Sequence, residues 1–239
     1  MLILALESSA LAASAAVAKD GKIISEAYLN TGLTHSETLL PLVRDCLDRA
    51  GASIGEIDAL AVASGPGSFT GVRIGVSAVK GLSFPQDIPV YGISTLEAMA
   101  WAAGIEGELI CPVMDARCQQ VYAALFRFEN GAPQRLTPDA PMKLDALVSL
   151  LRAYPQKPLL IGDGTDVAAA NFDTERVFYR RFPEIFRFQR AGAVAFAAFM
   201  RYNNGEQGID ASLLAPDYLR LAQAERERAA RLMKEETTV

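Results

Sequence analysis

Apolar and polar positions follow two rhythms along the first third of the chain. Short apolar runs that stop at polar residues or glycine are typical of buried strands, whereas apolar residues at every third or fourth position are typical of helices. Two β-prone runs flank Asp20-Gly21, a dipeptide that favours a tight hairpin turn. The pattern predicts strands at 2–6, 14–19, 22–29, 57–63 and 89–93, and helices at about 36–50, 72–83 and 95–103.

The same order of elements starts again in the middle of the chain in a shorter form. A strand is followed by a second hairpin, which turns at Asn130-Gly131, and then by a helix and another strand. The repetition predicts an α/β protein of two lobes whose second lobe is a reduced copy of the first. The predicted elements are strands at 109–114, 119–128 and 158–161, and helices at about 143–153 and 191–203.

This order predicts how the chain divides into lobes. We expect an amino-terminal lobe at 1–103 and a smaller second lobe at 104–203. The segment at about 204–222 is expected to pack back on the first lobe. Residues 223–239 form a charged tail of helix-forming residues with alternating charge, which is typical of a solvated helix.

The predicted helix at 36–50 is apolar on more than one side. Leu39 and Val43 share a face at helical spacing, and Leu40 lies off that face. Such a helix is either a central core helix or a helix that its own fold and another subunit both bury. The helix at 72–83 has a similar pattern, so the two helices could form half of a four-helix bundle between subunits. The residues predicted at this interface are His35, Leu39, Leu40, Val43, Leu47, Val72, Arg73, Val76, Val79 and Lys80.

Composition limits the partners and the compartment. The net charge of −5 disfavours direct RNA binding, because neutralising phosphates requires Lys and Arg. The three cysteines include no Cys-x-x-Cys pair, which indicates reduced thiols inside the cell. The N-terminus lacks the basic residues of a secretion signal, and no apolar stretch approaches the ~20 residues of a membrane span. We therefore expect a cytoplasmic protein with no membrane partner.

The glycine-rich stretch at 64–75 follows a predicted strand and opens a helix. Its glycines and the helix dipole favour an anion at this place. It lacks the Gly-Lys-Ser/Thr of a P-loop and the spacing of the dinucleotide fingerprint, so a tight turn without a ligand stays open as the alternative. Weak phosphate or nucleotide contacts are predicted for Glu7, Ser8, Gly65, Gly67, Ser68, Thr70 and Gly71.

No catalytic residue and no metal site is predicted. His35 is the one histidine, so no His-based metal cluster can form, and no G-x-S-x-G elbow accompanies it. Asp115-Ala116-Arg117 ends the first strand of the second lobe without the glycines that would wrap a phosphate there. Asp115, Arg117 and Tyr122 form either a structural salt-bridge cluster or a cleft site.

Six segments of the chain occur in the order found in the TsaB (YeaZ) family and together resemble it over almost the whole length. The most specific are His35-Ser-Glu-Thr-Leu-Leu-Pro41 and Gly65-Pro-Gly-Ser-Phe-Thr-Gly-Val-Arg-Ile-Gly75. The supporting segments are Leu4-Ala-Leu-Glu-Ser-Ser9, Ala78-Val-Lys-Gly81, Ser94-Thr-Leu-Glu-Ala98 and Pro216-Asp-Tyr-Leu-Arg220. Cys118 and Gln120 depart from the usual family pattern.

The resemblance implies an actin/Hsp70-like (ASKHA) fold and a role in N6-threonylcarbamoylation of adenosine 37 (t6A) in tRNAs that read codons starting with A. It implies a non-catalytic partner of the TsaD paralogue, association with the ATPase TsaE through the complex, homodimers, and only indirect contact with tRNA. No cofactor is implied for the isolated chain, and ATP or ADP would lie at the interface of the complex. TsaD has a His-x-x-x-His metal pair where this chain has Thr95 and Met99. The alternative on the same fold is a small-molecule kinase or ATPase.

Overall fold

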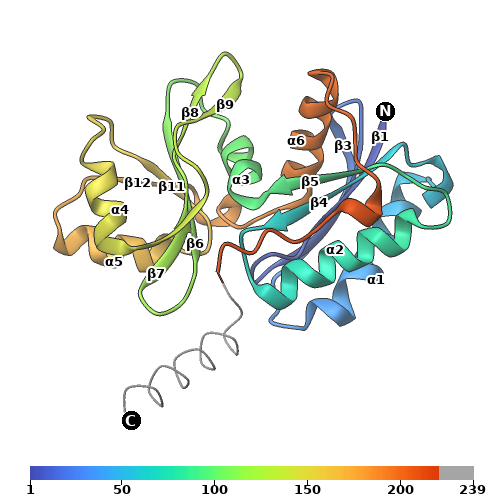
Figure 1. Cartoon of the computed structure of the whole chain (residues 1–239), viewed down its shortest axis with the longest axis horizontal. Coiled ribbons are helices and arrows are strands. Elements are labelled where there is room, and N and C mark those ends of the chain that lie inside the picture. Colours follow the sequence, from blue (N-terminus) through green and yellow to red (C-terminus); the bar gives the residue numbers. More distant parts are fainter. Residues whose placement is uncertain (221–239) are drawn as a thin grey trace, which may run out of the picture.

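The computed structural model describes residues 1–220, which form two α/β lobes, each built on its own sheet (Figure 1). The charged tail predicted at 223–239 and the last two residues of the 204–222 segment lie outside the described residues. Within residues 1–220, none of the helices has the length and apolar character needed to cross a membrane.

The amino-terminal sheet has five strands in the order β3-β2-β1-β4-β5. β1 pairs with β2 antiparallel and with β4 in parallel. Asp20 and Gly21 both have positive φ in the turn between β2 and β3, as a two-residue type I′ hairpin requires. The predicted strands and hairpin of this lobe are confirmed. The strands are β1 Leu2–Glu7, β2 Ala13–Lys19, β3 Lys22–Leu29, β4 Ala59–Gly65 and β5 Val90–Ser94.

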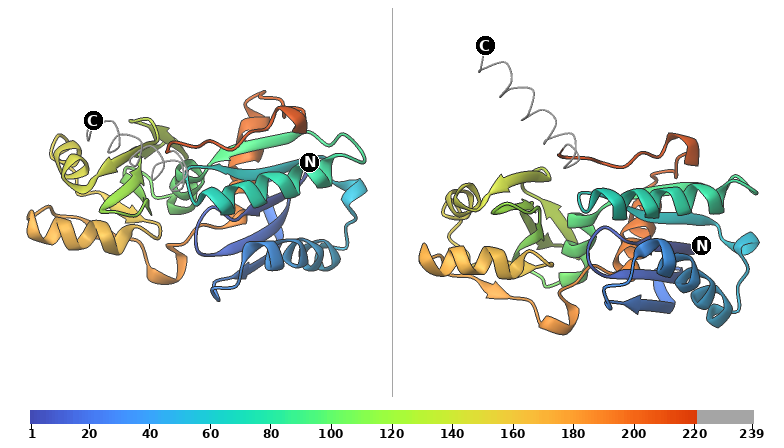
Figure 2. Two further views of the ribbon diagram at one scale, coloured as in Figure 1. Left: turned by 60° about the horizontal axis from the view of Figure 1, so that its bottom comes forward. Right: turned by 90° about the horizontal axis from the view of Figure 1, so that it is seen from below.

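Helices cover both faces of this sheet (Figures 1 and 2). Helices α1 (His35–Ala50) and α2 (Phe69–Ser83) lie on one face, and α3 (Thr95–Ala103) and α6 (Ala191–Asn203) lie on the other. Strand side chains alternate between these two layers. Because both layers are apolar, the residues from Leu2 to Leu6 of β1 form an unbroken apolar run and not an alternating one.

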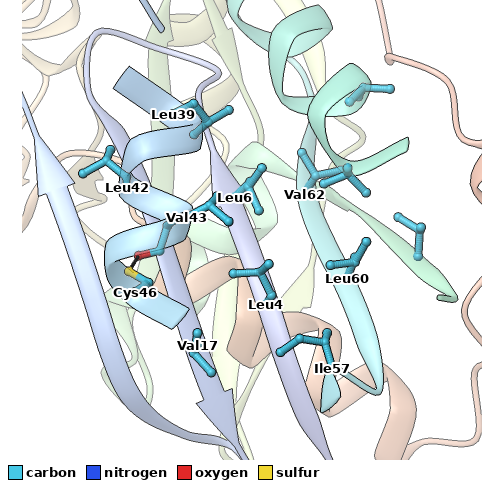
Figure 3. Close-up of a cluster of buried hydrophobic side chains, with 14 of the residues drawn as sticks. Leu4, Leu6, Val17, Leu39, Leu42, Val43, Cys46, Ile57, Leu60 and Val62 are labelled. Atoms are coloured by element: carbon cyan, nitrogen blue, oxygen red, sulfur yellow. Dashed lines mark hydrogen bonds between the residues drawn. The ribbon is translucent and has the colours of Figure 1, made fainter. Parts of the chain in front are cut away.

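The side of α1 and α2 that faces the sheet belongs to the core of this lobe, which corrects five of the residues predicted at the partner interface. In Figure 3, Leu39 and Val43 of α1 point toward Leu4 and Leu6 of β1. Their side chains are buried between helix and sheet, so another subunit has no access to them in this fold. The five residues enclosed in this way are Leu39, Val43, Val72, Val76 and Val79.

The second sheet has seven strands, with β10-β7-β6-β11-β12 in order and β8 and β9 paired off this path. The run predicted as one strand at 119–128 is two strands. Ala124 and Leu125 interrupt it, because β7 lies along one part of β6 and β8 along another. The elements are β6 Leu109–Asp115, β7 Gln120–Ala123, β8 Phe126–Glu129, β9 Ala132–Arg135, β10 Ala140–Lys143, α4 Leu144–Leu151, β11 Leu159–Ile161, α5 Thr165–Thr174 and β12 Arg180–Arg181. Three short 3-10 helices are Ile54–Glu56, Glu184–Phe186 and Ala211–Leu213.

Helix α6 shows where the chain returns to the first lobe. The division predicted from the sequence placed 191–203 in the second lobe, but α6 packs against β1, β2 and α3 of the first. Val194 and Ala198 lie in the same apolar cluster as Ile3 of β1. The amide of Ala191 also donates to the Ser14 hydroxyl of β2 at 2.8 Å. The boundary at 203 is therefore wrong for this helix, and the return is complete by residue 191.

Candidate functional site

A cavity of about 370 Å³ lies between the two lobes. The first lobe contributes the end of β1 and the turn before α2, and the second lobe contributes the ends of β6 and β11. A third wall comes from the end of the described chain. The lining residues that matter below are Ser9, Gly67, Ser68, Phe69, Asp115, Ala116, Arg117, Tyr122, Asp163, Asp217, Tyr218 and Arg220.

The glycine-rich turn is fastened to the end of β1. The amide of Ser68 donates to the carbonyl of Ser9 at 2.7 Å, and the Ser8 hydroxyl donates to the carbonyl of Gly71 at 2.9 Å. A Cβ at Gly67 or Gly71 would come closer than 3.0 Å to the carbonyl oxygen of Ser9 or Ser8. These two glycines are therefore required by close backbone packing, which favours the interpretation as a tight turn. Ser68 caps α2, since its hydroxyl accepts from the Gly71 amide at 3.3 Å.

Only part of the predicted anion site faces the cleft. Gly67 and Ser68 line it, and Thr70 is exposed on the first turn of α2. Glu7 and Ser8 are fully buried beneath the turn and do not line the cavity, so their predicted ligand contacts are not supported by their positions. The sequence could not separate these positions, because a strand end looks the same whether it faces a cleft or lies under a loop.

Glu7 is a buried carboxyl group with a raised pKa. Its Oε1 accepts from the Ser9 amide at 2.6 Å, and Oε2 has no hydrogen-bond partner among residues 1–220. Burial raises the pKa of Glu7 to about 7, and the neighbouring Asp163 carboxylate adds to the increase. The group is therefore protonated in part near neutral pH. This suits a carboxyl inside a packed lobe better than a carboxylate that holds a cation.

The second-lobe wall of the cleft is a self-contained turn. Asp115 accepts from the Arg117 amide at 2.7 Å and pairs with the Arg117 guanidinium at 3.3 Å. Arg117, Cys118 and Gln119 all have positive φ although none is glycine. The structure brings Asp115, Arg117 and Tyr122 together in the cleft lining. The Asp115–Arg117 pair is thus both a salt bridge and part of the cleft. The Asp115 carboxylate already has the Arg117 amide and guanidinium as partners.

Asp163 and Gln189 form a polar contact at the cleft that the sequence did not single out. Asp163 follows β11 and accepts from the Gln189 amide nitrogen at 2.9 Å. Burial raises the pKa of Asp163, and the hydrogen bond from Gln189 opposes this increase. Gly162 and Gly164 pack against the backbone of Val113 and Met114, so this stretch is a tight turn that has no room for side chains at the two glycines. Gln189 is 26 residues distant along the chain, and no local pattern marks it.

Residues 214–220, which we call the strap, cross the cleft from one lobe to the other (Figures 1 and 2). The Asp217 amide donates to the carbonyl of Ser64 at 2.7 Å, and the Tyr218 ring stacks on Phe69 with centroids 4.5 Å apart. At its end, the Arg220 guanidinium donates to the carbonyl of Ala116 in the second lobe. The sequence marked part of this segment only as a motif, because its partners lie far away along the chain.

The strap and Ser212, just before it, also engage two residues predicted at the partner interface. The Arg73 guanidinium lies 4.4 Å from the centroid of Phe69, and its Nε donates to the Tyr218 hydroxyl at 3.2 Å. Lys80 donates to the carbonyl of Ser212, just before the strap, at 3.3 Å. These bonds are internal, so Arg73 and Lys80 already have partners within the chain.

Five predicted interface residues keep some access to solvent: Leu40 and Arg73 are exposed, and His35, Leu47 and Lys80 are partly buried. The Leu40 side chain is 52% exposed. The His35 Nε2 lies 2.7 Å from the carbonyl of Ala10 and joins α1 to the loop after β1. Two further apolar side chains, Leu11 and Leu33, are more than half exposed. Leu40 is thus the member of the predicted interface that is both apolar and accessible.

Thr95 and Met99, which the family resemblance matches to the metal pair of TsaD, lie in the first two turns of α3. Thr95 and Met99 are both buried. Within residues 1–220, no group of three or more His, Cys, Asp or Glu side chains is arranged to hold a metal ion.

Comparison with known proteins identifies the family. The family profile described as "TsaD: tRNA N6-adenosine threonylcarbamoyltransferase" matches residues 29–227. The curated TsaB protein of Bacillus subtilis is 31% identical over 94% of this chain and 96% of its own length. The TsaB protein of Escherichia coli is 34% identical over 69% of this chain and 72% of its own length. YeaZ from Pseudomonas aeruginosa superposes with a TM-score of 0.75 at 28% identity, over 91% of this chain and 99% of that chain.

The chain also matches curated threonylcarbamoyltransferases and more distant proteins of the same fold. A curated threonylcarbamoyltransferase from Trichlorobacter lovleyi is 28% identical, but the chain covers only 44% of its length. More distantly, the activator of 2-hydroxyisocaproyl-CoA dehydratase from Clostridium difficile shares the fold, with a TM-score of 0.54 at 12% identity. This confirms the predicted α/β ASKHA fold. The chain belongs to the TsaB (YeaZ) family of tRNA threonylcarbamoyladenosine biosynthesis proteins.

Proposed function

We propose that the chain is a non-catalytic subunit that binds and activates the TsaD paralogue, and through it TsaE, in t6A formation on tRNA. The observation that carries this proposal is the match to the Bacillus subtilis TsaB protein over 96% of its length, against 44% of the Trichlorobacter lovleyi transferase. The chemistry of the cleft supports it. Thr95 and Met99 offer no pair of metal ligands, and the Asp115 carboxylate is held by its own turn.

The same role defines the remaining partners. The net charge of −5 favours indirect contact with tRNA, with the basic surface supplied by another subunit. No cofactor is assigned to the isolated chain, and ATP or ADP is assigned to the interface of the complex. A second copy of the chain competes for the same helical surface as TsaD. We place this assembly in the cytoplasm.

Reconstitution tests the proposed role. The purified chain, TsaD and TsaE are incubated singly and together with unmodified tRNA, threonylcarbamoyl-adenylate and ATP, and t6A is measured by mass spectrometry of digested nucleosides. We expect no t6A from the chain alone, and at least about tenfold more from TsaD with the chain than without it, a change of ~1.4 kcal/mol in barrier height. Robust t6A formation by the chain without TsaD would contradict the proposal.

Leu40→Glu is expected to weaken binding to TsaD, and to a second copy, by at least about tenfold, or ~1.4 kcal/mol. The side chain is 52% exposed on α1, so a charge there meets the partner and not the core. The melting temperature should stay within about 2 °C, because an exposed substitution changes the free energy of unfolding by ~0.5 kcal/mol or less. Binding is measured by calorimetry and self-association by sedimentation.

Ile105→Glu provides the matched control. Ile105 is 45% exposed but lies in the turn between α3 and β6, away from α1 and α2. Ile105→Glu should leave both the binding to TsaD and the self-association of the chain unchanged. If Leu40→Glu bound TsaD as tightly as the unmodified chain, the helical face would not be the interface.

A further inference from the structure

We propose that the strap is an internal latch that holds the two lobes in their closed arrangement and covers the amino end of α2. The inference concerns this chain by itself and holds whether or not the proposed function does. Residues 214–220 are bonded to both lobes, and residues 217–220 line the cavity between them.

The first anchor is set into the amino-terminal lobe. Leu214 is 4% exposed and lies in the same apolar cluster as α1, α2 and β1. The Asp217 amide then bonds to the carbonyl of Ser64 at 2.7 Å, at the end of β4. Gly65 has φ +129°, and a Cβ on it would come closer than 3.0 Å to the carbonyl oxygen of Asp217. The absence of a side chain at Gly65 thus leaves room for the backbone of the strap at the end of β4.

The second anchor is an aromatic and cationic stack at the start of α2. Phe69 is the first residue of the helix, and the Tyr218 ring lies on it at 4.5 Å with an interplanar angle of 25°. Arg73, one turn later, contacts the Phe69 ring at 4.4 Å and donates to the Tyr218 hydroxyl at 3.2 Å. A molecule that approached the amino end of α2 from the cleft would meet this stack.

The third anchor belongs to the other lobe. The Arg220 guanidinium donates to the carbonyl of Ala116, directly before the turn at 117–119. The lobes are also joined by α3, whose Leu96, Met99 and Ala100 share an apolar cluster with residues of the second lobe, and by the hydrogen bond from Ser94 to Asp139. Opening the cleft on the side of the strap requires either the Arg220 bond or the contacts of the strap with the first lobe to break.

A distance measurement between the lobes tests the latch in the full chain. Cys118, which is exposed, is replaced by serine, while Cys46 and Cys111 are buried and can stay. Spin labels are attached through Ser77→Cys on α2 and Ser149→Cys on α4, both exposed positions on opposite lobes. Double electron–electron resonance then reports the distribution of distances between them.

The latch predicts one narrow distribution in the chain with an intact strap. In Tyr218→Ala/Arg220→Ala the distribution of distances between the two spin labels should become at least about twofold wider and extend to longer distances. The reason is that the strap no longer holds the two lobes together. Hydrogen exchange of the backbone at 69–73 should also accelerate, because the stack no longer covers it. Arg49→Ala/Tyr202→Ala is the matched control, since both residues are exposed and lie outside the strap.

Milder variants keep the test decisive if the double variant does not fold, which circular dichroism would show. Arg220→Gln should widen the distribution, and Tyr218→Phe, which keeps the ring, should leave it narrow. An unchanged distribution in folded Tyr218→Ala/Arg220→Ala or in Arg220→Gln would overturn the latch. If the backbone amides at 69–73 exchanged hydrogen at the same rate in Tyr218→Ala as in the unmodified chain, the strap would not cover the amino end of α2.

Discussion

Gly71→Ala is expected to lower the free energy of unfolding by about 3 kcal/mol or more. Gly71 lies in the first turn of α2, and the helix passes so close to the end of β1 that a Cβ would come within 3.0 Å of the carbonyl oxygen of Ser8. That carbonyl belongs to a fully buried strand end and cannot move without the sheet. The added methyl group therefore has to push the helix away from the sheet.

The displacement would also break the contacts that join the helix to the strand. The Ser8 hydroxyl donates to the carbonyl of Gly71 at 2.9 Å, and the Ser68 amide donates to Ser9 at 2.7 Å. Val72 and Val76, which are packed in the core, would lose part of their burial. Overpacking against backbone is more costly than overpacking against a flexible side chain, because the backbone has fewer ways to yield.

Gly81→Ala in the same helix is the control. A Cβ at Gly81 meets no atom within 4 Å. Alanine there should be neutral or should raise the free energy of unfolding by up to ~1 kcal/mol, because it favours helix over the unfolded chain. Urea unfolding followed by circular dichroism measures both variants. Equal stabilities for Gly71→Ala and Gly81→Ala would show that helix and strand are not packed as described.

Glu7→Gln is expected to change how stability depends on pH. The pKa of Glu7 is about 7 in the folded chain, where burial is the main cause, against 4.5 for an ordinary glutamate. Because the folded pKa is the higher one, the contribution of Glu7 to stability is fully present below pH 4.5 and is lost as pH rises through 7. The difference between the two pKa values corresponds to roughly 3 kcal/mol.

Glutamine carries no titratable proton at this position, so it removes that loss. The free energy of unfolding of Glu7→Gln minus that of the unmodified chain should therefore rise by roughly 3 kcal/mol from pH 4.5 to pH 8. Burial also raises the pKa of Asp163, the carboxyl group near Glu7. Its effect on how the free energy of unfolding changes with pH has the same sign in both proteins. Urea unfolding at a series of pH values gives the difference directly.

Glu56→Gln is a control of opposite sign. Hydrogen bonds from the Ser53 amide and hydroxyl lower the pKa of Glu56, so its contribution to stability is lost as pH falls and not as it rises. A difference for Glu7→Gln that stayed constant from pH 4.5 to pH 8 would mean that the carboxyl is not buried as a neutral group.

Most of the first sheet and its helices followed from the spacing of apolar residues. The hairpin at Asp20-Gly21 and the ranges of α1, α2 and α3 agree with the pattern, because local turn chemistry and a buried helix face leave a mark on nearby residues. Helix α6 was also found at its predicted position. Its lobe was assigned wrongly, because an Ala-rich helix packs equally well on either sheet and its sequence does not say which.

The pattern could not distinguish burial by the chain itself from burial by a partner. Val43 and Val76 are apolar for the same reason in either case, namely that water is excluded from them. Their positions against the amino-terminal sheet show that the chain itself buries them. These positions depend on the tertiary structure and cannot be read from the local sequence. The cleft shows the same limit, because Ser64, Phe69 and Ala116 meet the strap across more than a hundred residues of chain.

The late position of α6 also bears on how the protein is made. The first five strands leave the ribosome early and α3 follows them directly, but α6, which covers the rest of their second face, begins about a hundred residues after β5. At a synthesis rate of ~5–20 residues per second, the alanine-rich face of that sheet stays without α6 for roughly 5–20 s. A nascent chain in this interval exposes Ile3, Ala5 and Ala16 to water and to other chains. The amino-terminal lobe therefore finishes folding only after the second lobe has been synthesised, so slow translation of 104–190 lengthens the period in which a chaperone is needed.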